Sequence, residues 1–226
     1  MEHVKELNDC EELVPSELGT KEYWDKTYVN GMKHFKESGV VDEGWFGEDS
    51  SLRVVKWLRS EQEVKKNDKI VDIGCGNGLL LLELAHEGFT DLTGFDYSTN
   101  AVELAKAIAT QQEVAIKFEV RDVLNDDLEP ELFDIALDKG TYDAVSLHND
   151  NTREKRVQYI NNVWKILKSK GKFVITSCNW TEKELVTHFN FKFSLHHVIP
   201  TPSFKFGGKT GNVVTSVIFE KREDIL

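Results

Sequence analysis

The sequence predicts an α/β fold built on an open sheet of seven strands, mostly parallel, with helices on both faces. Two observations support this prediction. From residue 69 onward, short apolar runs alternate with helical patterns, which is typical of βαβ units and of a parallel sheet. The last two apolar runs, residues 191–198 and 213–220, have no helical pattern between them. We therefore expect them to pair as a hairpin that adds an antiparallel C-terminal strand.

Ahead of the sheet, the sequence predicts a tail and a helical segment. Residues 1–15 are charged and lack hydrophobic periodicity, so we expect a flexible acidic tail. Residues 22–29 carry three aromatic side chains at spacings of four and five, which favours a helix with one packed face. Asp49 or Ser50 is the candidate N-cap of a second helix that ends near residue 59.

The remaining elements follow in strict alternation, as in a Rossmann-like sheet. A glycine-rich turn follows the first strand, and Ser98 and Thr181 are candidate N-caps of later helices. In such a sheet the ligand binds at the carboxyl ends of the strands, where the strand order reverses. The predicted strands of this part are residues 69–73, 92–95, 116–120, 133–137 and 172–177, and the predicted helices begin near residues 79, 99, 152 and 181.

Composition and charge argue against several classes of protein. The chain has 28 Lys and Arg against 39 Asp and Glu, a net charge of −11, whereas broad binding to nucleic-acid phosphates needs a basic surface. No run reaches the ~20 apolar residues of a membrane span, and the N-terminus lacks the apolar core of a signal peptide. We therefore expect neither nucleic acid nor a membrane as partner. We expect the protein in the cytoplasm, from which it can also enter the nucleus by diffusion.

The cysteines and histidines give no sign of a metal site. Cys10, Cys75 and Cys178 form no C-x-x-C pair, and the seven histidines show no ligand spacing. Neither structural zinc nor a disulfide framework is expected from this pattern. We expect a monomer without a metal ion.

A glycine-rich loop follows the first predicted strand, where residues 71–78 read VDIGCGNG. Glycines let the backbone adopt left-handed conformations and let a ligand approach closely. Gly74, Gly76 and Gly78 form G-x-G-x-G, which lacks the last glycine of a dinucleotide fingerprint and the Lys-Ser/Thr of a P-loop. Asp72 before the loop suits a cationic ligand better than a pyrophosphate. The loop therefore favours S-adenosylmethionine, and a turn without chemical role is the alternative.

Two acids stand at the ends of the next two predicted strands. Asp96 can accept hydrogen bonds from both ribose hydroxyls of a nucleoside. Asp122 can accept from the exocyclic amine of adenine, while Tyr97 and Val123 offer flat or apolar walls. Taken singly, Asp96 has the alternative of a charge at a helix N-terminus, and Asp122 that of a solvated turn residue. Their placement at successive strand ends favours the nucleoside site.

These motifs resemble those of a known family. VDIGCGNG, GFDYS, RDVL and LDKGTYD occur in the order and spacing of the class I S-adenosylmethionine-dependent methyltransferases. VPSELGTKEYWDKTY, DEGWFGEDS, DKGTYDAVSL, ITSCNWTEKEL and PTPSFKFGGKTGN look like the eukaryotic lysine methyltransferases that act on translation elongation factor 1-alpha. The resemblance runs from about residue 14 to 220.

The resemblance implies an enzyme that methylates a lysine of elongation factor 1-alpha. It implies one class I methyltransferase domain over residues 16–226, with a helical cap at about 16–62, a cofactor-binding half at 63–138 and a substrate-side half at 139–226. An acidic enzyme is electrostatically suited to a basic translation factor. A small-molecule methyltransferase and a non-catalytic cofactor-binding scaffold are the alternatives.

Methyl transfer to lysine sets requirements of its own. The reaction is an in-line displacement that depends on positioning, and a lysine with a pKa near 10.4 is neutral only about once in 10³ molecules at pH 7. Asp138, after the fourth strand, is the candidate polar group beside the amine and the cofactor, and Tyr142 the candidate wall. The alternative for Asp138 is a carboxylate held by backbone amides. The prolines of the Asn/Asp-Pro-Pro-Tyr/Phe motif are absent here, which argues against nucleic-acid methylation.

Five further aromatic residues are candidates with two interpretations each. Trp45 and Phe46 either cover the sulfonium through a cation–π contact or anchor the N-terminal segment. Trp180 either lines the lysine channel or forms a hydrophobic staple beside an S/T-x-x-E capping box. Phe204 and Phe206 lie in the loop 201–212, which either lines a groove for the protein substrate or forms a mobile hairpin.

Overall fold

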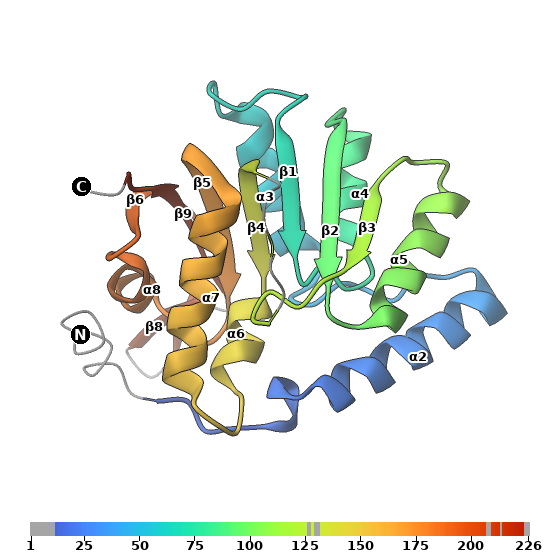
Figure 1. Cartoon of the computed structure of the whole chain (residues 1–226), viewed down its shortest axis with the longest axis horizontal. Helices are drawn as coiled ribbons and strands as arrows, with labels where there is room; N and C mark the ends of the chain where they lie inside the picture. The colour runs from blue at the N-terminus through green and yellow to red at the C-terminus, as the bar shows by residue number, and fades with distance from the viewer. Residues whose placement is uncertain (1–11, 126–127, 129–131, 207–208, 213, 224–226) are drawn as a thin grey trace.

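The computed structural model describes residues 12–125, 128, 132–206, 209–212 and 214–223. Seven strands form one sheet in the order β3-β2-β1-β4-β5-β9-β6, and helices cover both of its faces (Figure 1). The strands are β1 (Lys69–Ile73), β2 (Asp91–Asp96), β3 (Lys117–Val120), β4 (Phe133–Lys139), β5 (Leu167–Ser177), β6 (Phe193–Ile199) and β9 (Thr215–Lys221).

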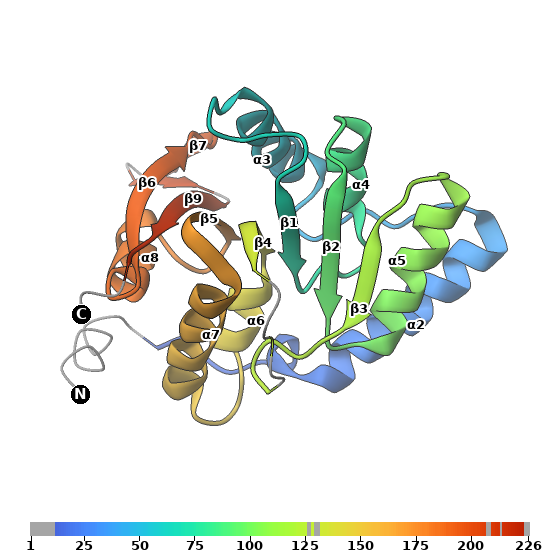
Figure 2. The same cartoon turned by 45° about the horizontal axis from the view of Figure 1, so that its top comes forward.

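The pairing of the strands confirms the predicted sheet. Parallel pairs join β1 to β2 and β4, β2 to β3, and β4 to β5. Strand β9 lies between β5 and β6 and is antiparallel to both (Figure 2). Strand order reverses between β1, which leads to β2 on one side, and β4 on the other. The carboxyl ends of these strands therefore form the crevice in which open α/β sheets bind ligands.

Each face of the sheet packs against its own set of helices. Buried side chains of α3 (Glu48–Ser60), α4 (Leu79–His86) and α5 (Thr99–Gln111) form one core with strands β1 to β5. Buried side chains of α6 (Thr141–Ser146), α7 (Thr152–Ile166) and α8 (Glu182–Phe189) form the other core. Burial of these apolar surfaces is the main force that holds helices on a sheet.

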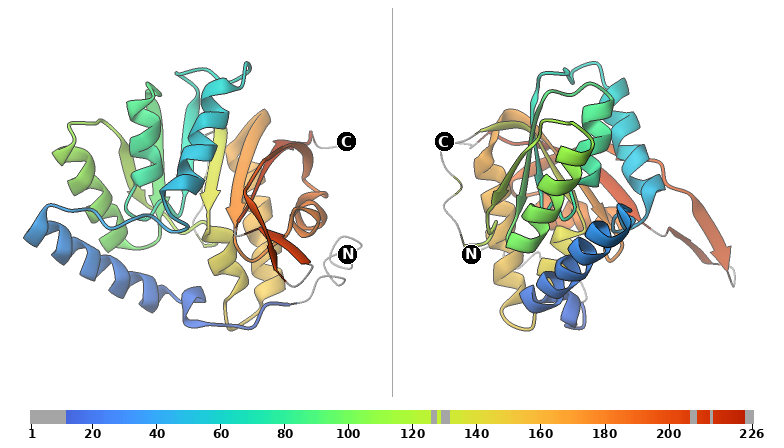
Figure 3. Two further views of the ribbon diagram at one scale, coloured as in Figure 1. Left: turned by 180° about the vertical axis from the view of Figure 1, so that it is seen from behind. Right: turned by 90° about the vertical axis from the view of Figure 1, so that its right-hand side faces the viewer.

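The N-terminal segment runs across the strand ends. The short 3₁₀ helix η2 (Glu17–Gly19) and helix α2 (Lys21–Ser38) lie below the carboxyl ends of the strands (Figures 1 and 3). Helix α2 is longer than the predicted span 22–29 and has no fully buried residue. Asp25 accepts a hydrogen bond from Ser98 Oγ (2.5 Å), which fixes α2 to the start of α5.

Several details differ from the sequence-based expectations. Of the tail expected at residues 1–15, residues 1–11 lie outside the described residues, whereas Glu12 already forms hydrogen bonds with Arg156 on α7. Helix α3 has Gly47 as its N-cap, so the predicted caps Asp49 and Ser50 lie inside its first turn, where the Ser50 hydroxyl donates to the carbonyls of Phe46 and Gly47. Helix α6 was not predicted, since its six residues follow a left-handed glycine and are too few to show periodicity.

The region 201–212, expected either to line a substrate groove or to form a hairpin, contains two strands. Strands β7 (Ser203–Phe206) and β8 (Lys209–Asn212) pair as an antiparallel ribbon that projects from the body of the molecule (Figure 3). The capping box of Thr181 and Glu184 at the start of α8 is confirmed. Within the described ranges, every helix is too short or too polar to traverse a bilayer.

Candidate active site

The loop between β1 and α4 has a backbone that only glycine fits. Gly74, Gly76 and Gly78 all have positive φ angles, of 70°, 55° and 77°. A Cβ on Gly76 would lie 2.5 Å from the Tyr28 hydroxyl. The N–H groups of Gly74 and Cys75 donate to the carbonyl oxygen of Phe95 (2.7 and 2.9 Å), so the loop is tied to the end of β2.

Asp96 joins the glycine loop to the start of α5. Its Oδ2 accepts from the Gly76 N–H (3.0 Å) and its Oδ1 from the Ser98 N–H (2.8 Å). Burial raises the pKa of Asp96 to about 6, partly offset by these two hydrogen bonds. Asp72 at the end of β1 is also buried, and this burial raises its pKa to about 7.

A cavity of about 430 Å³ lies between the strand ends and the N-terminal segment, within the size range of ligand pockets. Its walls include strand ends of the sheet, helix α2 and residues 42–45. Eight of the predicted cofactor-binding residues line it: Trp45, Asp72, Gly74, Gly76, Asp96, Tyr97, Asp122 and Val123. The structure therefore brings together residues that are up to 78 positions apart in the chain.

Sequence reasoning missed several residues of the wall. Trp24 and Tyr28 project from α2, with their rings stacked at 6.2 Å, and line the cavity together with Lys21. The spacing of these aromatic residues in the sequence predicted a packed helix face, but it did not indicate that this face covers the cavity at the strand ends. Lys139 and His148 also line the cavity.

Trp45 lies at the rim of this cavity. Its ring packs edge-on against Trp24 (5.3 Å between centroids), and 42% of the residue is exposed. Its carbonyl oxygen accepts a hydrogen bond from Lys139 Nζ (2.5 Å). Phe46 does not line the cavity; it has a φ of 69° and packs over Gly140, where a Cβ would lie 3.2 Å from its ring.

Asp138 points away from the cavity. Its Oδ1 accepts from the Thr141 N–H (2.8 Å), and its Oδ2 accepts from the Tyr142 N–H (2.9 Å) and from the Tyr159 hydroxyl. The residue is 2% exposed, and burial raises its pKa to about 7. This geometry corresponds to the alternative in which backbone amides hold the carboxylate.

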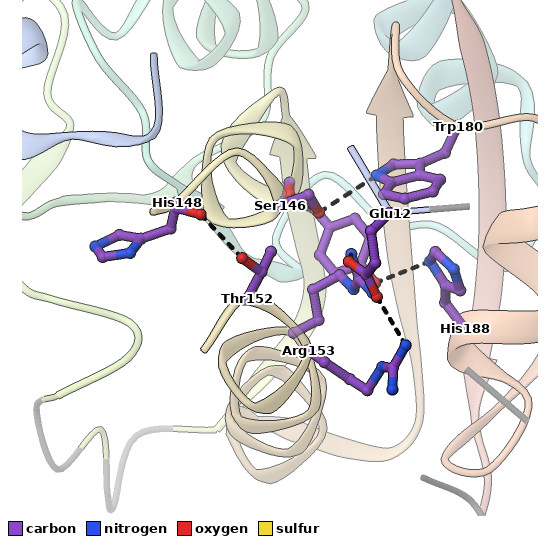
Figure 4. Close-up of polar contacts among 9 residues, drawn as sticks. Glu12, Ser146, His148, Thr152, Arg153, Trp180 and His188 are labelled. Carbon is purple, nitrogen blue, oxygen red and sulfur yellow. Dashed lines mark hydrogen bonds and ion pairs between the residues drawn. The ribbon is translucent and has the colours of Figure 1, made fainter. Parts of the chain in front are cut away.

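Tyr142 and Trp180 are also core residues that do not line the cavity. The Tyr142 hydroxyl is 3.0 Å from His188 Nδ1, and Trp180 Nε1 donates to Ser146 Oγ (3.3 Å), a contact that Figure 4 shows. The Trp180 ring also packs edge-on against His188 (4.6 Å). Tyr142 on α6 and Trp180, which precedes α8, therefore both pack against His188 of α8 and not against the cavity.

The remaining candidates, Gly78, Phe204 and Phe206, are not placed at the cavity by the structure. Gly78 does not line the cavity, and a Cβ there would lie 2.9 Å from the Phe118 ring. Phe204 and Phe206 belong to β7, and their side chains lie outside what the structure describes. Across the described part of the chain, no three His, Cys, Asp or Glu side chains gather as a metal-binding group.

The family model described as "Methyltransferase domain" matches residues 64–220, which include all seven strands of the main sheet except the end of β9, so the chain has a methyltransferase domain. N-methyltransferase NodS from Bradyrhizobium japonicum, solved with S-adenosyl-L-homocysteine, superposes with a TM-score of 0.64 at 18% identity, over 88% of this chain and 99% of that one. The Synechocystis magnesium protoporphyrin IX methyltransferase, solved with S-adenosylmethionine, gives 0.58 at 17% identity, over 87% and 96%. These two structures share the fold.

Curated relatives are similar over almost their whole length. EEF1A lysine methyltransferase 2 of Danio rerio is 44% identical over 94% of this chain and 91% of its own. The Homo sapiens protein of the same name is 44% identical over 92% and 89%. Protein-lysine N-methyltransferase efm4 of Schizosaccharomyces pombe is 37% identical over 92% and 95%. The chain belongs to the EEF1A lysine methyltransferase 2 family.

Proposed function

We propose that this chain transfers a methyl group from S-adenosylmethionine to a lysine side chain of translation elongation factor 1-alpha. The observation that carries the proposal is the cavity in which Asp96 is hydrogen-bonded to the glycine loop, at the point where the strand order reverses. The choice of substrate follows from the relatives, which carry that factor in their names.

The residues of the cavity fit an adenosine. Each carboxylate oxygen of Asp96 has one backbone N–H partner and therefore keeps a lone pair for a ribose hydroxyl. Asp122, with Oδ1 on the Leu124 N–H (2.9 Å) and Oδ2 on the Asn125 amide (2.8 Å), is held at the end of β3 for the adenine amine. Tyr97 and Val123 line the same part of the cavity and would flank the base. Gly74 and Gly76 line the cavity without a side chain, so the cofactor can approach their backbone closely.

When bound, S-adenosylmethionine supplies an electrophilic methyl group for in-line attack by an unprotonated amine. The chain itself positions the cofactor and the substrate amine and excludes water from them. Helix α2 covers the strand ends, and the aromatic ring of Trp45 at the rim suits a cationic group. We propose that Asp138 positions the turn from residue 138 to 142, since three donors occupy its carboxylate.

We further propose that the protein works as a monomer without a metal ion, on a protein rather than a nucleic acid, in the cytoplasm and with access to the nucleus. A net charge of −11 supports encounter with a basic protein and opposes binding to phosphates.

The test is to incubate the purified chain with methyl-labelled S-adenosylmethionine and recombinant elongation factor 1-alpha. Mass spectrometry of the factor should find methyl groups on lysine, and an Asp96→Ala variant should leave the factor unmodified. Label that appears only in small molecules of an added cell extract would favour a small-molecule methyltransferase. Binding of the cofactor without any transfer would favour a scaffold.

A further inference from the structure

Lys139 places a positive charge between two walls of the cavity. It is the last residue of β4, one position beyond the pair formed by Asp138 and Ile73, and so stands beside Gly74. Its Nζ donates to the Trp45 carbonyl oxygen (2.5 Å) and would lie 3.6 Å from a Cβ on Gly44. The ammonium group therefore lies beside residues 44–45, and the backbone of Lys139 stands beside the glycine loop.

No carboxylate of the described residues is directly paired with this ammonium group. Burial lowers the pKa of Lys139, and the more distant carboxylates of Asp72 and Asp138 oppose that change. Among the described residues, none of the ion pairs includes Lys139, and its hydrogen-bond partner is a neutral carbonyl oxygen. Lys139 is half-buried. Its ammonium group has three N–H donors, and withdrawing a charge from water is costly unless the charge is paired. An anionic group of a ligand would supply that pair.

The proposed cofactor carries such a group at one end. The acids at the ends of β3 and β2 assign adenine and ribose to those strands, and β1 and β4 follow in the sheet order. The amino-acid end, with one carboxylate and one ammonium group, is then expected over β1 and β4. Asp72 and Lys139 offer it one group of each charge on this side of the cavity.

The other described cations of the cavity wall lie elsewhere and have partners. Lys21 Nζ lies 5.5 Å from the centre of the Tyr97 ring, after β2. Arg121 pairs with Glu119 (3.0 Å) after β3, and Lys155 on α7 contacts His148 (2.7 Å). Lys139, at the end of β4, therefore lies at a different part of the cavity wall from these three cations.

We propose that Lys139 receives the carboxylate of the cofactor's amino-acid end and makes the cavity select nucleoside thioethers that carry this group. The inference rests on the proposed function, because it takes the nucleoside site at the ends of β2 and β3 as given. Lys139 is thus a specificity-determining residue for the cofactor.

The test compares two ligands by titration calorimetry on the same preparation. S-adenosyl-L-homocysteine carries the carboxylate, and its decarboxylated analogue lacks only this group and keeps the amine. The wild-type chain should bind the first more tightly by roughly tenfold to a hundredfold, the value of one charge-assisted hydrogen bond. In Lys139→Met the ratio should fall to near one, and in Lys139→Arg most of it should return. A ratio within one preparation is independent of the fraction that is folded.

Lys155→Met is the matched control, because it removes a cation from the same cavity at a different wall. Its ratio should equal that of the wild type. A wild-type ratio near one, or a Lys139→Met ratio as large as that of the wild type, would overturn the inference. Normal binding of both ligands without methylation of elongation factor 1-alpha would count against the proposed substrate alone. Failure of the wild type to bind S-adenosyl-L-homocysteine would overturn both proposals.

Discussion

The hydroxyl oxygen of Thr141 lies 2.0 Å from the point that a Cβ on Gly74 would occupy. The same hydroxyl donates to the carbonyl oxygen of Ile73 (2.7 Å). The start of α6 and the loop after β1 are therefore in direct contact across two neighbouring strands. Gly74 also has a φ of 70°, so both space and backbone conformation exclude a side chain there.

We expect Gly74→Ala to lower the free energy of unfolding by about 2–4 kcal/mol and to abolish binding of S-adenosyl-L-homocysteine. Denaturant unfolding and calorimetry measure the two effects. Gly88→Ala is the control, because Gly88 has a φ of 89° but no atom within 4 Å of its Cβ position. It should cost only the backbone strain, about 1 kcal/mol. Equal losses in both variants would show that the contact with Thr141 is unimportant.

The hydrogen bonds of Asp138 predict a structural defect on substitution. Asp138→Asn leaves one oxygen for three donors, so we expect a loss of about 1–3 kcal/mol in stability and weaker binding of S-adenosyl-L-homocysteine. Thermal and denaturant unfolding measure the first, and calorimetry the second. A variant of normal stability and cofactor affinity that transfers no methyl group would instead place Asp138 at the substrate amine.

For Tyr142, the buried position predicts little effect on catalysis. Tyr142→Phe removes a hydroxyl that contacts His188 Nδ1 at 3.0 Å, and we expect a stability loss of about 1 kcal/mol. The turnover number and the KM for elongation factor 1-alpha should stay within about twofold. Steady-state methylation assays with purified factor measure both constants. A tenfold lower turnover in a stable variant would mean that the hydroxyl reaches the substrate.

The environment of His188 predicts a loss of stability in acid. Burial, and next the charge of Arg156, lower its pKa to about 4, with Glu184 and Glu12 acting in the opposite direction. The unfolded chain, with a histidine pKa near 6.5, takes up the proton first as the pH falls. This contribution to stability is present above pH 6.5 and is lost between about pH 6.5 and 4. Denaturant unfolding should therefore show a steeper decline over this range for the wild type than for His188→Gln. A histidine NMR titration of His188 with a midpoint above 6 would contradict this.

Glu12 compensates a fully buried arginine. Arg156 has no exposed surface, and its guanidinium donates to both carboxylate oxygens of Glu12 (2.8 and 3.0 Å). We expect Glu12→Gln to cost about 1–3 kcal/mol of stability, less than a fully buried pair because Glu12 is partly exposed. Denaturant unfolding measures it. Glu37→Gln, in an exposed pair with Lys33 at 3.9 Å, should change stability by less than about 0.5 kcal/mol.

In the combined variant, Arg156→Met should recover part of what Glu12→Gln loses, because it removes the uncompensated charge. An additive loss in the double variant would show that the two side chains do not act as a pair.

The sequence allowed the sheet to be predicted, because buried parallel strands and amphipathic helices have distinct periods. It did not reveal the length of α2, since the residues after Val29 are mostly polar and no residue of this helix is fully buried. Its position depends on contacts such as that of Asp25 with Ser98, 73 residues away. Such contacts leave no trace in local periodicity.

Some residues of the candidate site were likewise predictable from the sequence, and others were not. The glycine loop, Asp96 and Asp122 were found because strand ends converge at one edge of a sheet. Asp138 and Lys139 are neighbours in β4, yet alternate side chains of a strand face opposite sides. The acidic residue was chosen for its chemistry, whereas the lysine is the one that lines the cavity.

The wall that η2 and α2 build has a consequence for shortened forms of this chain. A product that began at Lys69 would keep every strand of the sheet, the glycine turn and the acids beside it. It would lack Trp24, Tyr28 and Trp45. Such a truncated form would keep the sequence motifs of an enzyme, but its strand ends would be exposed to solvent, and it would also lack α3, which packs on one face of the sheet.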